Sequence, residues 1–381
     1  MKKILCFICI FSFLLSTSAT ALEPLKDEEL NVSAPCAVLM EKSTGQLLYE
    51  KNSHDRLSPA SITKIMTMLL IVEDIESGRI KTEDIVTASQ RAASFGGSCV
   101  YLEAGEKMSV HEMLKCIAVA SANDCAVAMA EHLSATEALF VERMNQKAQE
   151  LGLSDTHFTN CSGIFDDAEH YSSAYDVAVM SAELLKHDII KNYSTIWMDS
   201  IRNGEFELAN TNKLVYWYPD CTGLKTGFTS KAKYCLSASA QRDGMELIAV
   251  VMRSESSDKR NEDATMLLNY GFAGFSLCSL RDTKPLPEIF ADMGKENKIA
   301  LEYGAGEYAV IPKSGINPEY SFRLPDRVSA PVQKGDKLGE MIVSIGGEAV
   351  ENVPLLAAKN VPRIGFFGIF KRLAGSLFAI E

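Results

Sequence analysis

A serine and a lysine stand three residues apart at the start of an otherwise apolar segment, RLSPASITKIMTMLLIVE at residues 56–73. The apolar run predicts a helix, and Ser61 and Lys64 share one face of it because residues at i and i+3 are surface neighbours. A lysine buried in such a helix costs free energy unless it is paired or neutral. Lys64 therefore either extends to water or belongs to a functional site.

Two further motifs follow this pair along the chain. S-x-N occurs at Ser121–Asn123, and K-T-G occurs at Lys225–Gly227 on a predicted strand. The other two S-x-x-K pairs of the chain lie after both motifs, so only the pair at Ser61 precedes them. S-x-x-K, S-x-N and K-T-G in this order are typical of penicillin-binding proteins and class A β-lactamases.

These residue types suit acyl transfer through a serine. A serine hydroxyl is a weak nucleophile without a base, and Lys64 can take its proton if burial and neighbouring cations keep the amine neutral. The N-terminus of the helix favours the negative charge that develops there. Ser121 can relay a proton to the leaving group, and Asn123 can hold the peptide group of the substrate. Lys225 and Thr226, on a strand edge, can bind a carboxylate while the strand aligns an extended peptide.

At this point the chain resembles the exported low-molecular-mass D-alanyl-D-alanine carboxypeptidases, which are penicillin-binding serine peptidases. The segments SPASITKIMT, VASANDCAVAMAE and GLKTGFTSKAKYCL look like family segments in family order, and the resemblance covers roughly residues 30–275. It implies that Ser61 is the acylated nucleophile and Lys64 the base. It also implies that Ser121, Asn123 and Lys225 complete the catalytic core.

The resemblance further implies an oxyanion hole made by the backbone N–H groups of Ser61 and Phe228. Thr226 and Gly227 then belong to the substrate-binding strand, and Arg260 stands where the family has an arginine near the terminal carboxylate. Phe228 departs from relatives that carry a polar side chain after K-T-G. The implied reaction removes the terminal D-alanine from peptidoglycan stem pentapeptides. β-Lactams should acylate the same serine, and neither a metal nor an organic cofactor is needed.

Two other functions fit parts of the pattern. A class A β-lactamase needs a glutamate that activates the deacylating water. Glu169 is the best-placed acid, but Ser173 occupies the position of the accompanying asparagine. A β-lactam-binding sensor or wall-binding protein would instead form a long-lived acyl-enzyme with vestigial catalysis. The three intact motifs favour the carboxypeptidase.

The first residues indicate a secretory signal peptide. Lys2 and Lys3 precede an apolar run, and small residues at Ala19–Ala21 predict cleavage after residue 21. Loss of these two lysines would move the formal charge of the 381-residue chain from −12 to about −14, which argues against nucleic acid as a partner. We therefore expect an exported protein that works at the outer face of the cytoplasmic membrane or in the cell wall.

The remaining pattern predicts an α+β fold. A β-hairpin over residues 36–52 precedes the helical region, and three strands follow that region. This order favours a mostly antiparallel sheet of the penicillin-binding/β-lactamase type, covered by helices and followed by a small all-β domain. The predicted domains are a signal peptide at 1–21, a catalytic domain at 22–280, a β-sandwich-like domain at 281–360 and an amphipathic helix at 361–381.

The tail and the cysteines allow two smaller predictions. Five apolar residues recur along one stripe of the tail, at Phe366, Phe370, Leu373, Leu377 and Ile380. With its basic flanks, this helix is expected to lie in a membrane interface, the alternative being a terminal helix packed on the body of the protein. The eight cysteines after residue 21 are expected mainly as buried free thiols. The histidines show no metal-binding spacing.

Overall fold

The computed structural model describes residues 30–165, 167–280, 285–304, 307–313, 315–370 and 372. The described part of the chain forms two compact units. The larger holds its residues from 23–285 and 305–315, and the smaller holds those from 286–304 and 316–381. The segment 305–315 thus belongs to the larger unit. The domain boundary predicted from the sequence, at residue 280, assigned this segment to the C-terminal domain.

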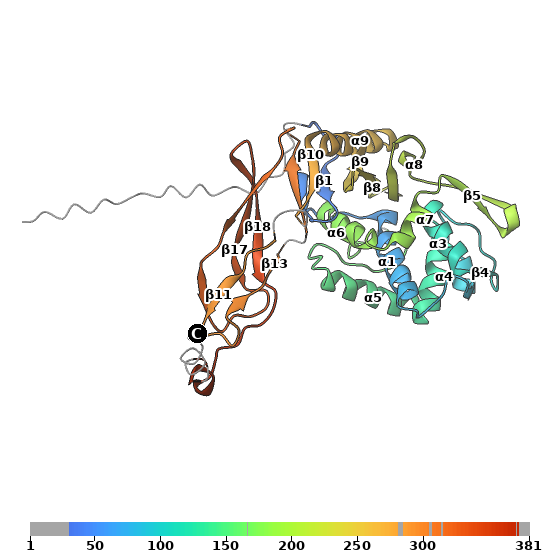
Figure 1. Ribbon diagram of the computed structural model, residues 1–381. Coiled ribbons are helices and arrows are strands. Elements are labelled where there is room, and N and C mark those ends of the chain that lie inside the picture. Colours follow the sequence, from blue (N-terminus) through green and yellow to red (C-terminus); the bar gives the residue numbers. More distant parts are fainter. Residues whose placement is uncertain are drawn as a thin grey trace, which may run out of the picture. The chain divides into compact units, whose positions relative to one another are not determined.

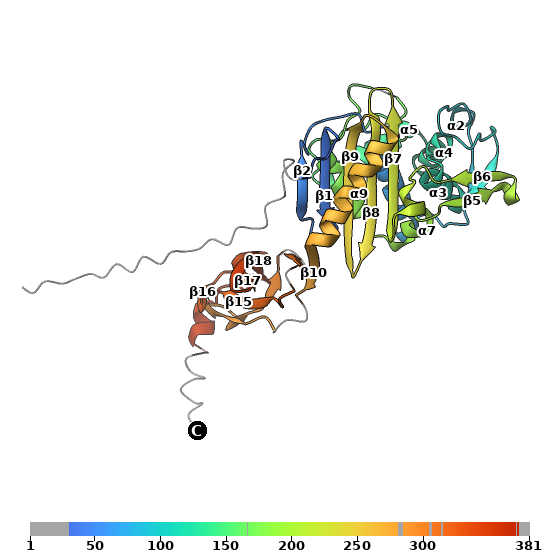
Figure 2. The same cartoon turned by 90° about the horizontal axis from the view of Figure 1, so that it is seen from above.

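A five-stranded antiparallel sheet forms the centre of the larger unit, in the order β2-β1-β9-β8-β7 (Figures 1 and 2). The strands are β1 (Cys36–Glu41), β2 (Leu47–Lys51), β7 (Cys221–Thr229), β8 (Lys233–Arg242) and β9 (Met245–Ser254). The expected hairpin is present, because β1 turns into β2 through residues 42–46. A second hairpin joins β8 to β9 at residues 243 and 244. The antiparallel α+β fold predicted from the sequence is confirmed.

Helices cover both faces of this sheet. Helix α9 (Ser257–Gly274) lies across one face, and α6 (Ala174–Leu184) lies against the other, next to α1 (Lys64–Glu76) (Figures 1 and 2). Successive side chains of a strand point to opposite faces. Accordingly, Val38 joins the core on the side covered by α6, whereas Leu39 packs under α9 at Gly271. Because both faces are covered, every residue of β1 is buried.

The helical half of the larger unit contributes one side of the candidate site. Its longer helices are α3 (Val110–Val119), α4 (Asn123–Ser134) and α5 (Glu137–Glu150). Shorter elements between residues 60 and 217 are η2 (Ala60–Thr63), β3 (Ile85–Thr87), α2 (Gln90–Ala93), β4 (Lys107–Ser109), η3 (Asp188–Ile190), α7 (Lys191–Ser194), β5 (Met198–Ile201), η4 (Arg202–Gly204), β6 (Phe206–Ala209) and α8 (Leu214–Trp217). All eight cysteines of the described residues are free thiols, and five of them are buried, as expected.

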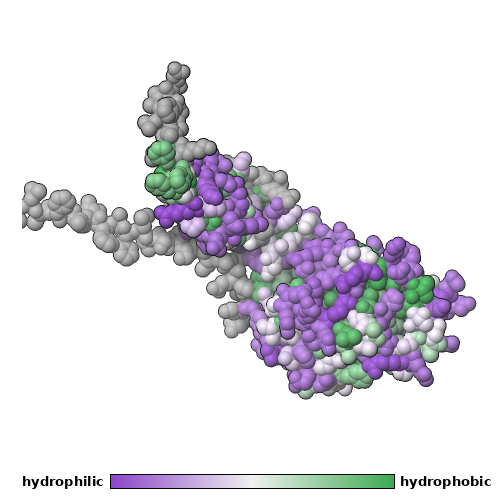
Figure 3. Space-filling model, turned by 90° about the horizontal axis from the view of Figure 1, so that it is seen from below, coloured by the Kyte–Doolittle hydropathy of each residue, from purple (hydrophilic) through white to green (hydrophobic). Residues whose placement is uncertain are grey.

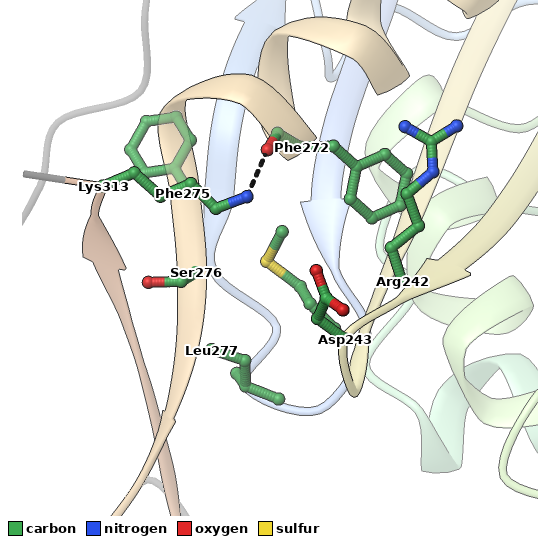
Figure 4. A pocket seen from close by; sticks show the side chains of 8 residues that line it. Arg242, Asp243, Phe272, Phe275, Ser276, Leu277 and Lys313 are labelled. Carbon is green, nitrogen blue, oxygen red and sulfur yellow. Dashed lines mark hydrogen bonds between the residues drawn. The ribbon is translucent and has the colours of Figure 1, made fainter. Parts of the chain in front are cut away.

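A two-stranded ladder of β10 (Phe275–Ser279) and β14 (Tyr308–Pro312) ties residues 305–315 to the larger unit. Lys313, directly after β14, donates from Nζ to the carbonyl oxygen of Phe272 at 2.7 Å (Figure 4). A cation at the C-terminal end of α9 is favoured by the helix dipole. The bond lies beside a small cavity of about 170 Å³, over which Arg242 stacks on the Phe272 ring.

The smaller unit consists of two sheets. One has the order β12-β11-β16 and the other the order β13-β18-β17-β15. Their bounds are β11 (Ile289–Asp292), β12 (Lys298–Ile299), β13 (Leu301–Tyr303), β15 (Glu319–Arg323), β16 (Arg327–Ser329), β17 (Lys337–Ile345) and β18 (Glu348–Ala357). All pairs are antiparallel except β11 with β16. The predicted all-β character of this region is confirmed.

A short helix at 366–370 follows the smaller unit's strands. It exposes three phenylalanines, with 79% of Phe366, 87% of Phe367 and 69% of Phe370 accessible to solvent. Figure 3 shows hydrophobic side chains gathered in one group on this unit. The expected stripe residues 373, 377 and 380 lie outside the described part of the chain. None of the described helices is long and apolar enough to span a bilayer.

Candidate active site

Ser61 does not lie in the α-helix where we expected it. It belongs to the 3₁₀ turn η2, and α1 begins only at Lys64. Ala60, just before the serine, has a positive φ of 48°, so the chain bends sharply there. Residues at i and i+3 of a 3₁₀ helix eclipse one another, so the serine and the lysine remain neighbours. Nζ of Lys64 lies 3.0 Å from Oγ of Ser61.

Lys64 is fully buried and has two further partners. Its Nζ donates to Oδ1 of Asn123 at 2.6 Å and to the carbonyl oxygen of Ser162 at 2.7 Å. The side-chain amide of Asn123 donates in turn to the carbonyl oxygen of Gly96, which orients its Oδ1 toward the lysine. Both partners of Lys64 can only accept hydrogen bonds. They therefore take both N–H groups of a neutral amine and leave its lone pair facing the Ser61 hydroxyl.

Burial also favours the neutral form of Lys64. Because the charged ammonium is deprived of water, the pKa of Lys64 falls from 10.5 to about 7. Lys225 is equally buried, and its pKa is lowered by burial first and by the neighbouring charges of Lys64 and Arg260 second. Burial alone accounts for the lowered pKa of Lys64, and it suits this amine to accept a proton near neutral pH.

Strand β7 approaches η2 closely because of Gly227. A Cβ atom at this position would lie 2.7 Å from the carbonyl oxygen of Pro59 and 3.2 Å from Cβ of Ala60. Any larger residue would therefore push the strand away from the turn that carries Ser61. The glycine of the K-T-G motif is explained by this contact.

The S-x-N motif lies in a sharp turn between α3 and α4, within the region that the sequence predicted to be helical. Ser121 has a positive φ of 61°, and α4 begins at Asn123. The backbone N–H of Asn123 donates to the carbonyl oxygen of Ser98 at 2.7 Å. The turn therefore places Ser121 at the surface of the cleft and directs Asn123 inward, to Lys64.

One cleft of about 390 Å³ brings the predicted residues together. It is lined by Ser61, Ser98, Ser121, Thr211, Lys213, Thr226, Gly227, Phe228, Tyr234, Ser257 and Arg260. Lys64, Asn123 and Lys225 are buried side chains rather than members of this lining. Lys225 Nζ donates to the backbone oxygen of Thr226, whose hydroxyl donates to Thr211 at 2.7 Å.

The loop at residues 160–163 is part of the arrangement that the sequence did not indicate. Oδ1 of Asn160 accepts from the backbone N–H groups of Ser162 and Gly163, which fixes the carbonyl oxygen that Lys64 uses. Gly163 has a φ of +75°, and a Cβ there would lie 1.8 Å from the carbonyl oxygen of Ala60. Ser162 contacts Lys64 through its backbone carbonyl oxygen. The residue type at this position therefore could not indicate the contact.

His170 supports the η2 turn, which carries Ser61, through hydrogen bonds by way of Thr63. Its Nδ1 accepts from the backbone N–H of Thr159 at 3.0 Å, so the proton is assigned to Nε2, which lies 2.7 Å from Oγ1 of Thr63. Thr63 donates onward to the carbonyl oxygen of Ala60. Burial lowers the pKa of His170 to about 4, so the ring is neutral at ordinary pH. It acts as a fixed donor behind Ser61.

Other candidate groups do not line this cleft. Glu169, the acid that a β-lactamase would need, is exposed and is not among the lining residues. Among the described residues, no group of three or more His, Cys, Asp or Glu side chains is placed to hold a metal ion.

Comparison with known proteins identifies the family. A family model described as D-alanyl-D-alanine carboxypeptidase matches residues 21–256, and one described as the C-terminal domain of penicillin-binding protein 5 matches residues 285–363. The chain is 41% identical over 385 residues to D-alanyl-D-alanine carboxypeptidase DacF of Bacillus subtilis, with 98% of each protein covered. It is 30% identical to DacC of Escherichia coli over 94% of this chain and 91% of that protein.

Solved structures agree with this result. Penicillin-binding protein 5 of Haemophilus influenzae matches with a TM-score of 0.78 and 30% identity, over 87% of this chain and 98% of that one. Penicillin-binding protein D2 of Listeria monocytogenes in its ampicillin-bound form matches with a TM-score of 0.59 and 28% identity, over 64% and 99%. The fold is shared with these penicillin-binding proteins. The chain belongs to the D-alanyl-D-alanine carboxypeptidase family and is a serine peptidase.

Proposed function

We propose that this protein removes the terminal D-alanine from peptidoglycan stem pentapeptides through an acyl-enzyme on Ser61. The observation that carries the proposal is the environment of Lys64, whose two acceptor-only partners leave its lone pair to the Ser61 hydroxyl at 3.0 Å. Membership of the carboxypeptidase family supports the same reaction. Removal of the donor D-alanine would limit cross-linking of the wall.

Acylation begins when the Ser61 proton passes to Lys64 while Oγ bonds to the carbonyl carbon of the penultimate D-alanine. The backbone N–H groups of Ser61 and Phe228 hold the oxyanion that forms. The proton then moves from Lys64, by way of Ser121, to the nitrogen of the terminal D-alanine. The C–N bond breaks and D-alanine leaves.

Deacylation uses the same groups in the opposite direction. Water adds to the ester carbon as its proton passes to Lys64, and the ester bond breaks as Ser61 regains a proton. Thr226 and Arg260 bind the substrate's terminal carboxylate before it leaves, and buried Lys225 adds positive potential behind them. Asn123 holds both Lys64 and the peptide group of the substrate. The scheme requires no metal and no organic cofactor.

β-Lactams enter the same scheme as covalent inhibitors, because they present a reactive amide beside a carboxylate. Penicillin-binding protein D2 in its ampicillin-bound form is a structural neighbour of this chain. We expect β-lactams to acylate Ser61 in this protein, with opening of the lactam ring.

Release of D-alanine from diacetyl-L-Lys-D-Ala-D-Ala tests the proposed activity. The wild-type protein should release D-alanine catalytically, and Ser61→Ala should release none. Ser154→Ala is the matched control, because Ser154 is an exposed serine outside the cleft. Stoichiometric penicillin binding without turnover of the peptide would favour the sensor instead, and equal release by Ser61→Ala would refute the proposed nucleophile.

The location of the protein belongs to the same proposal. Residues 1–21 act as a cleaved signal peptide, the catalytic domain spans 22–280, and the β domain spans 281–360. The tail at 361–381 then rests on the outer face of the cytoplasmic membrane. The exposed phenylalanines of the helix at 366–370 support an interfacial contact of this kind.

Sedimentation with vesicles that contain anionic phosphatidylglycerol tests this attachment. Replacing Phe366, Phe367 and Phe370 together by serine should abolish co-sedimentation of the mature chain. Phe290→Ser is the control, because Phe290 is 49% exposed on the same unit but lies outside the tail. Unchanged binding of the triple variant would show that the tail is not the membrane contact.

A further inference from the structure

An aromatic pair, one ring exposed and the other half-buried, lines the cleft just after the K-T-G motif. Phe228 on β7 and Tyr234 on β8 are directly paired across the two strands. Their ring centroids lie 4.5 Å apart, with 37° between the ring planes. Phe228 is nevertheless 54% exposed, so one side of the pair faces open space.

The pair lies beside the groups that bind the substrate carboxylate in the proposed function. Phe228 is two residues from Thr226 on the same strand, so both side chains point to one face of the sheet. Tyr234 and Arg260 complete the same part of the cleft lining. Gly227 faces the opposite way, toward Pro59 and Ala60. A carboxylate held by Thr226 and Arg260 would therefore lie next to an apolar wall.

Elementary geometry connects this wall to one part of the substrate. In a peptide that ends in a D-amino acid, the side chain branches from the carbon atom that carries the terminal carboxylate. Anchoring that carboxylate brings the side chain within reach of the neighbouring wall. An aromatic face that is already held by stacking loses little conformational entropy when an apolar group covers it.

We propose that the Phe228–Tyr234 pair determines which terminal residue the enzyme releases, by favouring D-amino acids with an apolar side chain over glycine. The inference rests on the proposed function, because it uses the carboxylate site of the same cleft. Chemically, the favoured leaving groups are D-alanine and larger apolar D-residues such as D-leucine. The residue after K-T-G then contributes through its side chain, in addition to its backbone N–H group.

Hydrolysis of diacetyl-L-Lys-D-Ala-X, with X as D-leucine, D-alanine or glycine, tests this selection. For the wild type we expect kcat/KM for D-leucine to exceed that for glycine about tenfold, the equivalent of about 1.4 kcal/mol. Phe228→Ala should bring this ratio below about threefold, because the loss for D-leucine exceeds that for glycine. The control is Phe290→Ala, which removes an exposed aromatic side chain of the smaller unit. It should leave the ratio at its wild-type value.

Each outcome decides the matter. A wild-type ratio near one, or a ratio that Phe228→Ala leaves unchanged, overturns the inference while D-alanine release keeps the proposed function intact. If the wild type releases no terminal residue and takes up no penicillin, the proposed function fails and the inference with it. Should Phe228→Ala lose penicillin labelling through misfolding, Tyr234→Ala and the wild-type series still measure the ratio.

Discussion

Replacing Gly163 by alanine places a methyl group where the structure has a backbone carbonyl. The new Cβ would lie 1.8 Å from the oxygen of Ala60, and the residue would keep a φ of +75°. The left-handed conformation costs a non-glycine residue roughly 1–2 kcal/mol, and shifting packed backbone costs typically about 1–3 kcal/mol more. We expect the free energy of unfolding to fall by about 2–5 kcal/mol, with Tm lowered by roughly 4–20 °C.

Catalysis should suffer beyond this loss of stability. The alanine would displace both Ala60, next to the nucleophile, and the neighbouring carbonyl oxygen of Ser162 that holds Lys64. Misplacement by about 1 Å can cost on the order of 100-fold in rate. We therefore expect acylation by a fluorescent penicillin, followed by stopped flow well below Tm, to slow at least about tenfold.

Gly152→Ala provides the matched control. Gly152 has a φ of +70°, but nothing lies within 4 Å of its would-be Cβ. This variant should show the conformational cost alone, about 1–2 kcal/mol, with acylation at the wild-type rate. If both alanine variants unfold at the same temperature and acylate equally fast, the contact between Gly163 and Ala60 does not position the nucleophile.

Three further predictions follow from named contacts. The proposed mechanism uses the neutral amine of Lys64, whose pKa is about 7. The acylation rate should therefore reach its maximum above that pH and fall about tenfold per pH unit below pH 6. A flat rate profile between pH 5 and 8 would contradict this role. His170→Ala should slow acylation and lower the free energy of unfolding by about 1–3 kcal/mol. His170→Gln, which keeps a donor for Thr63, should partly restore both. If the two variants behave alike, the hydrogen bond to Thr63 does not support the turn that carries Ser61. Asp263→Ala removes three hydrogen bonds to Ser33–Ala34 and should cost about 2–4 kcal/mol in urea unfolding, whereas a loss under 0.5 kcal/mol, within the range of ordinary surface changes, would show that these bonds are unimportant.

The sequence was sufficient to pair Ser61 with Lys64, the proposed nucleophile and base, because their relation is local. Ser61 and Lys64 are neighbours in either a 3₁₀ turn or an α-helix, so the error in the helix start did not affect their pairing. The carbonyl oxygen of Ser162 lies 98 residues further along the chain and carries no side-chain signal. The same holds for Gly163, whose role depends on a backbone that only the folded chain brings near.

Long-range strand pairing limited the prediction of the fold in the same way. The apolar run of β1 and the turn to β2 are local and were visible in the sequence. The pairing of β10 with β14 joins residues 275–279 to 308–312, and no local pattern distinguishes β14 from the strands of the smaller unit. Contact between distant segments therefore assigned residues 305–315 to the larger unit.

Peptide mapping by mass spectrometry after brief reaction with benzylpenicillin tests most directly whether Ser61 is the nucleophile and Lys64 its base. We expect one penicilloyl group per chain, on the peptide that contains Ser61. Lys64→Ala should carry almost no penicilloyl group after the same time at pH 8. A cooperative thermal unfolding transition should show that this variant is still folded. A penicilloyl group on another residue, or labelling of Lys64→Ala at the wild-type rate, would contradict the assignment.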